Sequence, residues 1–531
     1  MGGRRRVGAS RRRRRRTAGR LLLGLLLVGA LAAAGVAAAV RFWSGASLVA
    51  DRTALARLEL QPLAGSLVSA RAFTAGGVEF PIGVEHGRLV PETAVPAGLT
   101  VRVEVVVRRP GWLARVAGRF RHERLTIRTP VASVADRWVT LARGAKLVLR
   151  FDQPVDRVVV RGRTVAVGGR RSVDLGRPPA PSGAVRVAAA ARSWEQLGAA
   201  QRVTWFPKTR APAVLVSPAP GATVSPLAAV RLVFAEPVAQ VLGGARPALA
   251  PAAAGRWSEP DAHTLVFRPG GLGLPMGGRL SLRLARATSA GRTLRWTIAE
   301  GSLLRLHQLL AQEGYLPVDW QPDHAPVAGT RAAQVAAAVD PPAGRFTWRY
   351  PNTPPQLRRL WDPARITQIT RGAVMMFEDE HHLTVDGFAG PHVWRALLAD
   401  ALAGKRRTDG YSYVYVHTQL PQLLTLWHNG RVVLTSPGNT GIPATPTAPG
   451  TFPVFEHIPV GEMKGTNPDG SHYDDKGIRW ISYFHGGEAL HAFNRASFGT
   501  PQSLGCVELP LAAAAKVWPY TPIGTLVTIE N

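Results

Sequence analysis

One cysteine and one histidine near the end of the chain have the types and spacing that nucleophilic catalysis requires. Cys506 is the only cysteine in the chain, and His491 precedes it with Gly499 and Pro501 between them. A thiol attacks as its thiolate, and the pKa of free cysteine is about 8.5, so a base or positive charge must lie nearby. The intervening turn residues favour two adjacent strands, and Gly505 would let a substrate carbonyl approach backbone N–H donors. A structural role for both residues is the alternative, since buried cysteine often acts as a small hydrophobe.

Two sequence motifs resemble a known family. His491 is followed by Gly499-x-Pro501-x-Ser503-Leu504-Gly505-Cys506-Val507, which resembles the signature of the YkuD-type L,D-transpeptidases, a histidine before a Ser-His-Gly-Cys block. Upstream, the Thr-Pro-rich segment 443–454 with its Gly-x-Phe resembles a second motif of that family, in the same order. The resemblance covers residues 411–531. It implies a mainly-β catalytic domain that acts on peptidoglycan stem peptides and needs neither a metal nor an organic cofactor.

The resemblance also implies roles for individual residues. Cys506 would be the nucleophile and His491 the general base and acid, while Gly505 and Ser503 would lie at the oxyanion and substrate side. His485 is a rival base, but the adjacent Gly486 and Gly487 indicate a hairpin turn, and the family pattern aligns with His491.

The sequence departs from the family pattern at two positions, which keeps three functions open. Leu504 stands where a second histidine is usual, and Glu508 stands where arginine or asparagine is usual. The domain would be an L,D-transpeptidase forming cross-links through a cysteine thioester, an L,D-carboxypeptidase with water as acceptor, or a catalytically silent wall-binding scaffold.

Alternation of apolar residues predicts strands at 413–416, 423–427 and 432–436, with a hairpin turn at 428–431. The polar, glycine-flanked stretch 464–477 indicates a loop, either a lid over the site or a plain surface loop.

The amino terminus is typical of a membrane anchor. Residues 1–20 are a basic, arginine-rich tail, and 21–40 contain no charged residue, enough to cross a hydrocarbon core of about 30 Å. This asymmetry predicts a single-pass protein of the cell membrane whose later domains lie on the cell-wall side. A cleaved signal peptide is the alternative.

The chain is strongly basic, with a formal net charge of +30. Such a charge favours polyanionic partners, and we expect anionic wall polymers or lipid head groups. The anchor and the lack of a basic recognition helix argue against nucleic acid.

Between the anchor and the catalytic domain, the patterns predict three further domains. Period-two alternation at 46–207 predicts a β-rich stalk, and the strands at 211–300 resemble bacterial immunoglobulin-like domains. For both regions a role as spacers is favoured over a binding role. From 301 the period becomes about 3.6, with Leu303, Leu306, Leu309 and Leu310 on one helix face. With the Asp-Gly-x-x-Gly-Pro turn before a Trp-containing helix at 383–398, the segment 301–404 resembles a peptidoglycan-binding helical module.

Two stretches of this module carry separate expectations. Residues 326–350 are rich in Pro, Ala and Gly, which predicts a linker or an insertion. The acidic and histidine cluster 378–382 suggests a metal site, but contiguous residues cannot share one helix face, so a solvated polar stretch is favoured. The fold class predicted is therefore multidomain: a transmembrane helix, two β-sandwich-like domains, a small helical module and a mainly-β catalytic domain.

Overall fold

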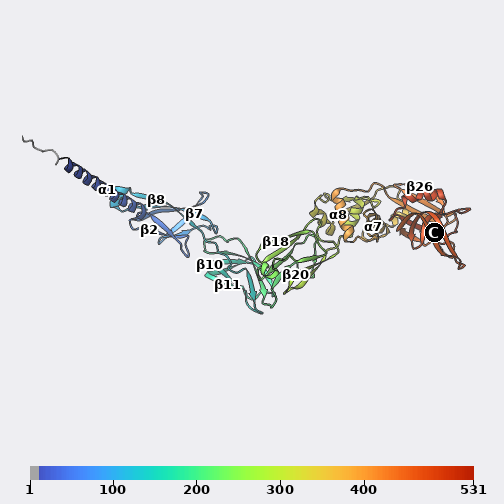
Figure 1. Cartoon of the computed structure of the whole chain (residues 1–531), viewed down its shortest axis with the longest axis horizontal. Coiled ribbons are helices and arrows are strands. Elements are labelled where there is room, and N and C mark those ends of the chain that lie inside the picture. Colours follow the sequence, from blue (N-terminus) through green and yellow to red (C-terminus); the bar gives the residue numbers. More distant parts are fainter. Residues whose placement is uncertain (1–10) are drawn as a thin grey trace, which may run out of the picture. The chain divides into compact units, whose positions relative to one another are not determined.

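The computed structural model describes residues 11–531, with side chains from residue 25 onward. The chain divides into two compact units, Met1–Ala213 and Val214–Asn531. The first half of the predicted basic tail, residues 1–10, lies outside the described residues. Figure 1 follows the chain from blue to red.

A single long helix precedes the β-structure. Helix α1 (Arg11–Trp43) contains an apolar stretch, Leu25–Trp43, with a mean hydropathy of 2.1 and no burial against the rest of the chain. Leucine and alanine favour helix, and 19 residues are enough to cross a bilayer core. The helix fits a membrane anchor or a signal sequence.

The range 46–207, expected to be one stalk domain, contains two hydrophobic cores. Alternation identifies the strands, as in β7, where Val101, Val103, Val105 and Val107 are buried and the residues between them are not. It does not say which strands share a core, and this is why the division was missed. The first core is formed by two four-stranded sheets. In spatial order, one sheet is β1 (Ala46–Val49), β2 (Ala56–Leu60), β6 (Arg88–Pro91), β5 (Ile82–Glu85). The other is β4 (Glu79–Phe80), β3 (Ser66–Thr74), β7 (Thr100–Arg108), β8 (Phe120–Arg128), and helix α2 (Gly111–Ala117) connects β7 to β8. The second lies with a five-stranded sheet, β11 (Arg163–Asp174), β10 (Val148–Val160), β12 (Gly183–Ala190), β13 (Gln201–Pro207), β9 (Trp138–Leu141).

The second unit begins with two four-stranded sheets around one core that includes Phe234, Phe267 and Trp296. In spatial order the sheets are β14 (Val214–Ser217), β16 (Val230–Phe234), β19 (Thr264–Pro269), β18 (Gly255–Asp261) and β15 (Thr223–Val224), β21 (Gly291–Ile298), β20 (Arg279–Thr288), β17 (Ala248–Ala250), with α3 (Val238–Leu242) following β16.

The helical segment follows directly. Helix α4 (Leu303–Gln312) buries Leu306, Leu309 and Leu310, as its period predicted. The stretch 326–350 is not a linker, because it contributes α5 (Arg331–Val339) and β23 (Gly344–Trp348), which pairs with β22 (Val318–Pro322). The Thr330 hydroxyl caps α5 by accepting a hydrogen bond from the Ala333 N–H. The composition of the stretch does not reveal this helix start. The remaining helices are α6 (Pro355–Arg359), α7 (Gln368–Glu380) and α8 (Pro391–Ala403).

The C-terminal part consists of two sheets. One has the order β26 (Arg431–Pro437), β25 (Leu423–His428), β24 (Ser412–His417), β32 (Leu526–Glu530), β27 (Gly450–Pro453); the other has β28 (Glu456–Thr466), β29 (His472–His485), β30 (Glu488–Ala492), β31 (Val507–Leu509). Helix α9 (Leu511–Val517) and the 3-10 turn Trp518–Tyr520 follow β31. The predicted strands and the turn at Asn429 and Gly430, both with positive φ, are confirmed.

The helical segment and the first of these sheets share one core. Tyr413, Trp427 and Leu526 from the strands belong to the same buried cluster as residues of α4, α7 and α8. Helix α7 approaches β32 so closely that a Cβ on Gly372 would lie 2.4 Å from the Gly524 carbonyl oxygen. The close contact therefore requires glycine in the helix.

This contact yields a test of the shared core. Gly372→Ala should lower the free energy of unfolding by about 1–3 kcal/mol, because the added methyl forces the helix away from the backbone it touches. Gly329→Ala, where a Cβ would meet nothing within 4 Å, is the control and should stay within about 0.5 kcal/mol. Denaturant unfolding measures both, and an equally stable Gly372→Ala protein would contradict the close packing.

Candidate active site

The parallel pairing of β30 with β31 brings the two predicted catalytic residues to one sheet face. Leu490 pairs with Val507, and His491 pairs with Glu508, so Cys506 continues the ladder beside Ala489. Successive side chains in a strand point to opposite faces. Leu490 and Val507 enter the core between the sheets, and Cys506 packs with Ala489 in a separate cluster. The face opposite the core therefore carries Ala489, His491, Cys506 and Glu508.

The His491 ring is held in a state suited to a base. It is only 3% exposed, and its Nδ1 lies 3.0 Å from the Ala492 carbonyl oxygen. Since a carbonyl can only accept, Nδ1 carries the proton and Nε2 keeps its lone pair. Burial lowers the pKa of His491, so the ring is neutral at pH 7.

The Cys506 thiol is protonated in the resting site. Burial, followed by the charges of Glu508 and Glu488, raises its pKa to about 12, although a hydrogen bond from the Ala489 backbone opposes this. The Sγ lies 3.6 Å from the Gly487 carbonyl oxygen. Among residues 25–531, whose side chains are described, no hydrogen bond joins Cys506 to His491. The resting thiol is therefore not a thiolate, and attack by it would need a base.

Ser503 and Gly505 shape the turn that presents the thiol. The Ser503 hydroxyl donates to the Cys506 carbonyl at 2.6 Å and accepts from the Gly505 N–H at 3.2 Å. Gly505 has φ of +121°, which disfavours a side chain there. The Gly505 N–H, which was predicted as an oxyanion donor, thus donates to the Ser503 hydroxyl. The contacts of Ser503 stabilise the turn.

The residues just before the Thr-Pro-rich segment contact the cysteine motif. The Ile442 N–H donates to the Ser503 carbonyl at 2.9 Å, and the Ser503 N–H donates to Thr440. Further along, the Ala448 N–H donates to the Glu488 carboxylate at 3.1 Å. The two segments therefore form one wall of the site.

The off-pattern Glu508 has a partner that sequence reasoning missed. Arg495, in the connection between β30 and β31, holds the buried Glu508 carboxylate by two hydrogen bonds of 2.8 and 2.7 Å. Bidentate pairs of this kind fix geometry as well as charge. The opposite charges of Arg495 and Glu508 within one motif were the sequence signal that could have predicted this pair. Leu504, the other departure, is half-buried and offers packing only.

His485 is engaged in a different environment from His491. It is exposed at the end of β29, its ring lies 4.4 Å from that of Phe452, and its Nδ1 lies 3.5 Å from Glu488 Oε2. Glu488, which was also missed, lies beside the thiol, and burial raises its own pKa although Ala448 and His485 oppose this.

The stretch 464–477 is a β-hairpin arm. Lys464 pairs with Asp474 across β28 and β29, and the tip at 467–471 and the bulge at Gly477 are unpaired. Burial raises the pKa of Tyr473 on this arm and of Tyr483 further along β29, and a thiolate at Cys506 would raise each pKa further. The arm thus brings aromatic rings toward the thiol.

The cluster 378–382 is not a solvated stretch throughout. Glu378 is 1% exposed, and its carboxylate accepts from the N–H groups of Asp386 and Gly387 at 3.0 and 2.8 Å. Burial raises the pKa of Glu378 to about 7. No group of three potential metal ligands occurs among the described residues.

The comparisons with known proteins agree with the site. Residues 400–529 match the model of the YkuD family, the L,D-transpeptidase catalytic domain. The chain therefore carries an L,D-transpeptidase catalytic domain at these residues. A comparison with curated protein sequences found no match.

Solved L,D-transpeptidases are similar to parts of the chain. One from Mycobacterium smegmatis is 16% identical over 60% of this chain and 98% of its own. L,D-transpeptidase 3 from Mycobacterium tuberculosis is 11% identical over the same shares, and an E. faecium catalytic domain is 24% identical over 22% and 96%. The TM-score is 0.21 in each case, so the assignment rests on the family model.

The ion pair gives the first prediction at the site. Arg495→Met should lower the free energy of unfolding by about 3 kcal/mol, because it leaves the buried Glu508 charge unpaired. This value is at the low end for a buried pair because the Arg495 side chain is one-third exposed. Replacing both residues by methionine should recover part of this loss. Arg479→Met, at an exposed arginine, is the control. Urea unfolding measures all variants, and an unchanged midpoint for Arg495→Met would contradict the role of the pair.

The carboxylates beside the thiol give a second prediction. Glu488→Gln keeps an acceptor for the Ala448 N–H but removes a charge that opposes the thiolate, so the thiol pKa should fall. Alkylation of Cys506 by iodoacetamide at pH 8 should become roughly two- to tenfold faster, a shift of up to about one pKa unit. Glu456→Gln, on exposed β28, should leave the rate unchanged. A slower Glu488→Gln reaction would show that this carboxylate assists the thiol.

Proposed function

We propose that the chain is a peptidoglycan L,D-transpeptidase that forms cross-links between stem peptides through a thioester on Cys506. The observation that supports this most is the common face of Cys506 and His491 on adjacent parallel strands, with the lone pair of His491 Nε2 free to accept a proton. The YkuD match at 400–529 supports the reaction class.

The proposed reaction has two acyl transfers. Cys506 Sγ attacks the carbonyl of the third stem residue, a diaminopimelate at its L-centre, while the thiol proton moves to His491 Nε2. Collapse of the tetrahedral intermediate breaks the bond to the terminal D-Ala, whose amine takes that proton and leaves. The acceptor amine then attacks the thioester and loses a proton to His491, which returns it to the thiolate.

The raised pKa of Cys506 supports a base-dependent first step. A thiol with a pKa of about 12 is almost fully protonated at pH 7, so attack must be coupled to proton transfer. Main-chain N–H groups around Cys506 would stabilise the oxyanion.

Two alternative functions are consistent with some of the same observations. A carboxypeptidase forms the same thioester and differs only in using water as acceptor. A silent scaffold would be consistent with the protonated thiol and with the lack of a described hydrogen bond between Cys506 and His491.

We further propose where the enzyme works. Helix α1 would anchor it in the cell membrane, with the later domains on the cell-wall side, where peptidoglycan is found. The β-rich regions at 46–207 and 211–300 would act as spacers, and 301–404 as a peptidoglycan-binding-like module. Exposed arginines would favour anionic wall polymers.

Intact-mass spectrometry after exposure to a carbapenem or a tetrapeptide stem tests the thioester. The unmodified enzyme should gain one adduct, Cys506→Ala none, and His491→Ala should acylate about 10²–10⁴-fold more slowly. His485→Ala should cost far less, and Leu504→His should be tolerated or mildly activating.

Several outcomes discriminate among the readings. An unmodified enzyme that forms no adduct at any pH where a thiolate is populated would favour the scaffold. Loss of acylation in His485→Ala, but not in His491→Ala, would refute the assignment of the base. Product analysis with an added acceptor stem then separates cross-linking from hydrolysis.

A further inference from the structure

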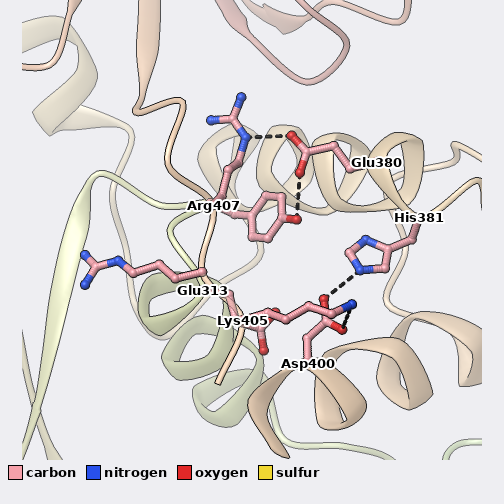
Figure 2. Close-up of a pocket in the computed structure, with 8 residues that line it drawn as sticks. Glu313, Glu380, His381, Asp400, Lys405 and Arg407 are labelled. Atoms are coloured by element: carbon pink, nitrogen blue, oxygen red, sulfur yellow. Dashed lines mark hydrogen bonds and ion pairs between the residues drawn. The ribbon is translucent and has the colours of Figure 1, made fainter. Parts of the chain in front are cut away.

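A polar pocket of about 400 Å³ lies in the helical segment, on elements other than those that carry Cys506 and His491. Glu313 and Tyr315 follow α4, Glu380 and His381 end α7, and α8 contributes Asp400. The lining is completed by Lys405, Arg406 and Arg407 (Figure 2). This size lies within the range of about 300–1,000 Å³ found for small-molecule sites.

Two of the three carboxylates in the pocket are paired. Glu380 accepts from the Tyr315 hydroxyl at 2.8 Å and from Arg407 Nε at 2.6 Å. Asp400 lies 2.7 Å from His381 Nε2 and 2.8 Å from Lys405 Nζ. Figure 2 shows the contact of Glu380 with Arg407 and the contacts of Asp400 with His381 and Lys405 as dashed lines.

Glu313 is different, because neither of its carboxyl oxygens has a hydrogen-bond partner. The residue is only 3% exposed and caps the C-terminal end of α4, where the helix dipole disfavours negative charge. Burial and the Asp400 charge raise the pKa of Glu313 to about 9, although Arg305 and Lys405 oppose this. A buried carboxyl without a partner costs free energy that a suitable ligand would recover.

The buried oxygens of Glu313 lack a hydrogen-bond donor, which a ligand would have to supply. The mouth of the pocket carries cationic side chains, which suit a negatively charged group on the same ligand. The side chains of Lys405 and Arg406 are 63% and 57% exposed, and among the described residues Arg406 forms one ion pair, with Asp319 at 3.8 Å. Arg406 is therefore available for a ligand carboxylate, and Lys405 would share its contact with Asp400 to reach the same group. An anion could accept the O–H of the neutral Glu313 acid but would leave the other carboxyl oxygen without a donor, and these residues do not form a metal-binding group.

We propose that this pocket binds a zwitterionic amino-acid group, with the ligand ammonium on Glu313 and the ligand carboxylate on Arg406 and Lys405. The two carboxyl oxygens are closed to solvent in the resting pocket, so Lys405, which lies over this side, moves as the ammonium enters. Binding converts the neutral Glu313 acid into a carboxylate and releases one proton to solvent. The ligand is either a free amino acid or the zwitterionic end of a stem-peptide side chain, and only the second source rests on the proposed function.

Isothermal titration of the full-length protein in detergent tests the proposal. The probes are diaminopimelate, a stem tripeptide ending in diaminopimelate, N-acetylated diaminopimelate without free ammonium groups, and cadaverine, which lacks carboxylates. We expect the first or second probe to bind, with proton release at pH 7 visible as a dependence of the heat on buffer ionisation. The acetylated probe and cadaverine should bind at least tenfold more weakly.

Variants locate the binding. Glu313→Gln should weaken binding at least tenfold and abolish proton release, and Arg406→Gln should weaken binding of carboxylate-bearing probes only. Glu300→Gln, at an exposed glutamate outside the pocket, should behave as the unmodified protein. Acylation of Cys506 by a carbapenem serves as the folding check and should be unchanged in all three.

The outcomes separate this site from the catalytic proposal. Tighter binding of the tripeptide assigns the pocket to the stem peptide, and equal binding of free diaminopimelate assigns it to a small amino acid. No binding of either, binding unaffected by Glu313→Gln, or equal affinity for cadaverine would overturn the zwitterion site. Failed acylation of Cys506 in the unmodified protein would refute the proposed chemistry while leaving this result valid.

Discussion

The register of β30 against β31 is the constraint on which the catalytic geometry depends. A slip of one residue would turn Cys506 into the core and bring Val507 to the outer face, because side chains alternate along a strand. Leu490 and Val507 resist this by filling the core between the sheets. The Arg495–Glu508 pair resists it as well, because it ties the connection between the two strands to β31 itself. The departure at Glu508 is thus part of the structure that positions the thiol.

The charges around the thiol are arranged to keep it protonated until it reacts. Glu488 and Glu508 both face it, and burial strengthens their effect by reducing solvent screening. Each carboxylate is held by other groups, Glu508 by Arg495 and Glu488 by the Ala448 N–H. The remaining neutral base with a free lone pair on this face is His491. In the proposed mechanism, a bound substrate would therefore have to complete the path of the proton from Cys506 to His491.

Local patterns in the sequence predicted local structure well. Strand alternation located β24, β25 and β26, and the Asn-Gly pair located their turn, because these signals come from neighbouring residues. The cysteine motif indicated the candidate site through its resemblance to a family. Pairing over long distances was not predictable, and it decides that 46–207 has two cores and that Arg495 meets Glu508. Glu313 could not be singled out either, since its lack of a partner is a property of the folded pocket.

Helix α7 links the helical segment to the catalytic sheets more tightly than a tethered binding module would allow. Its Gly372 lies against Gly524, two residues before β32, and its last residue, Glu380, lines the polar pocket. Strand β32 in turn pairs with β24, the central strand of the first catalytic sheet, and with the edge strand β27. A packed interior transmits displacement because it contains little free volume. The proposed ligand between Glu313 and Arg406 would therefore act on the same packed core that includes strands of the first catalytic sheet.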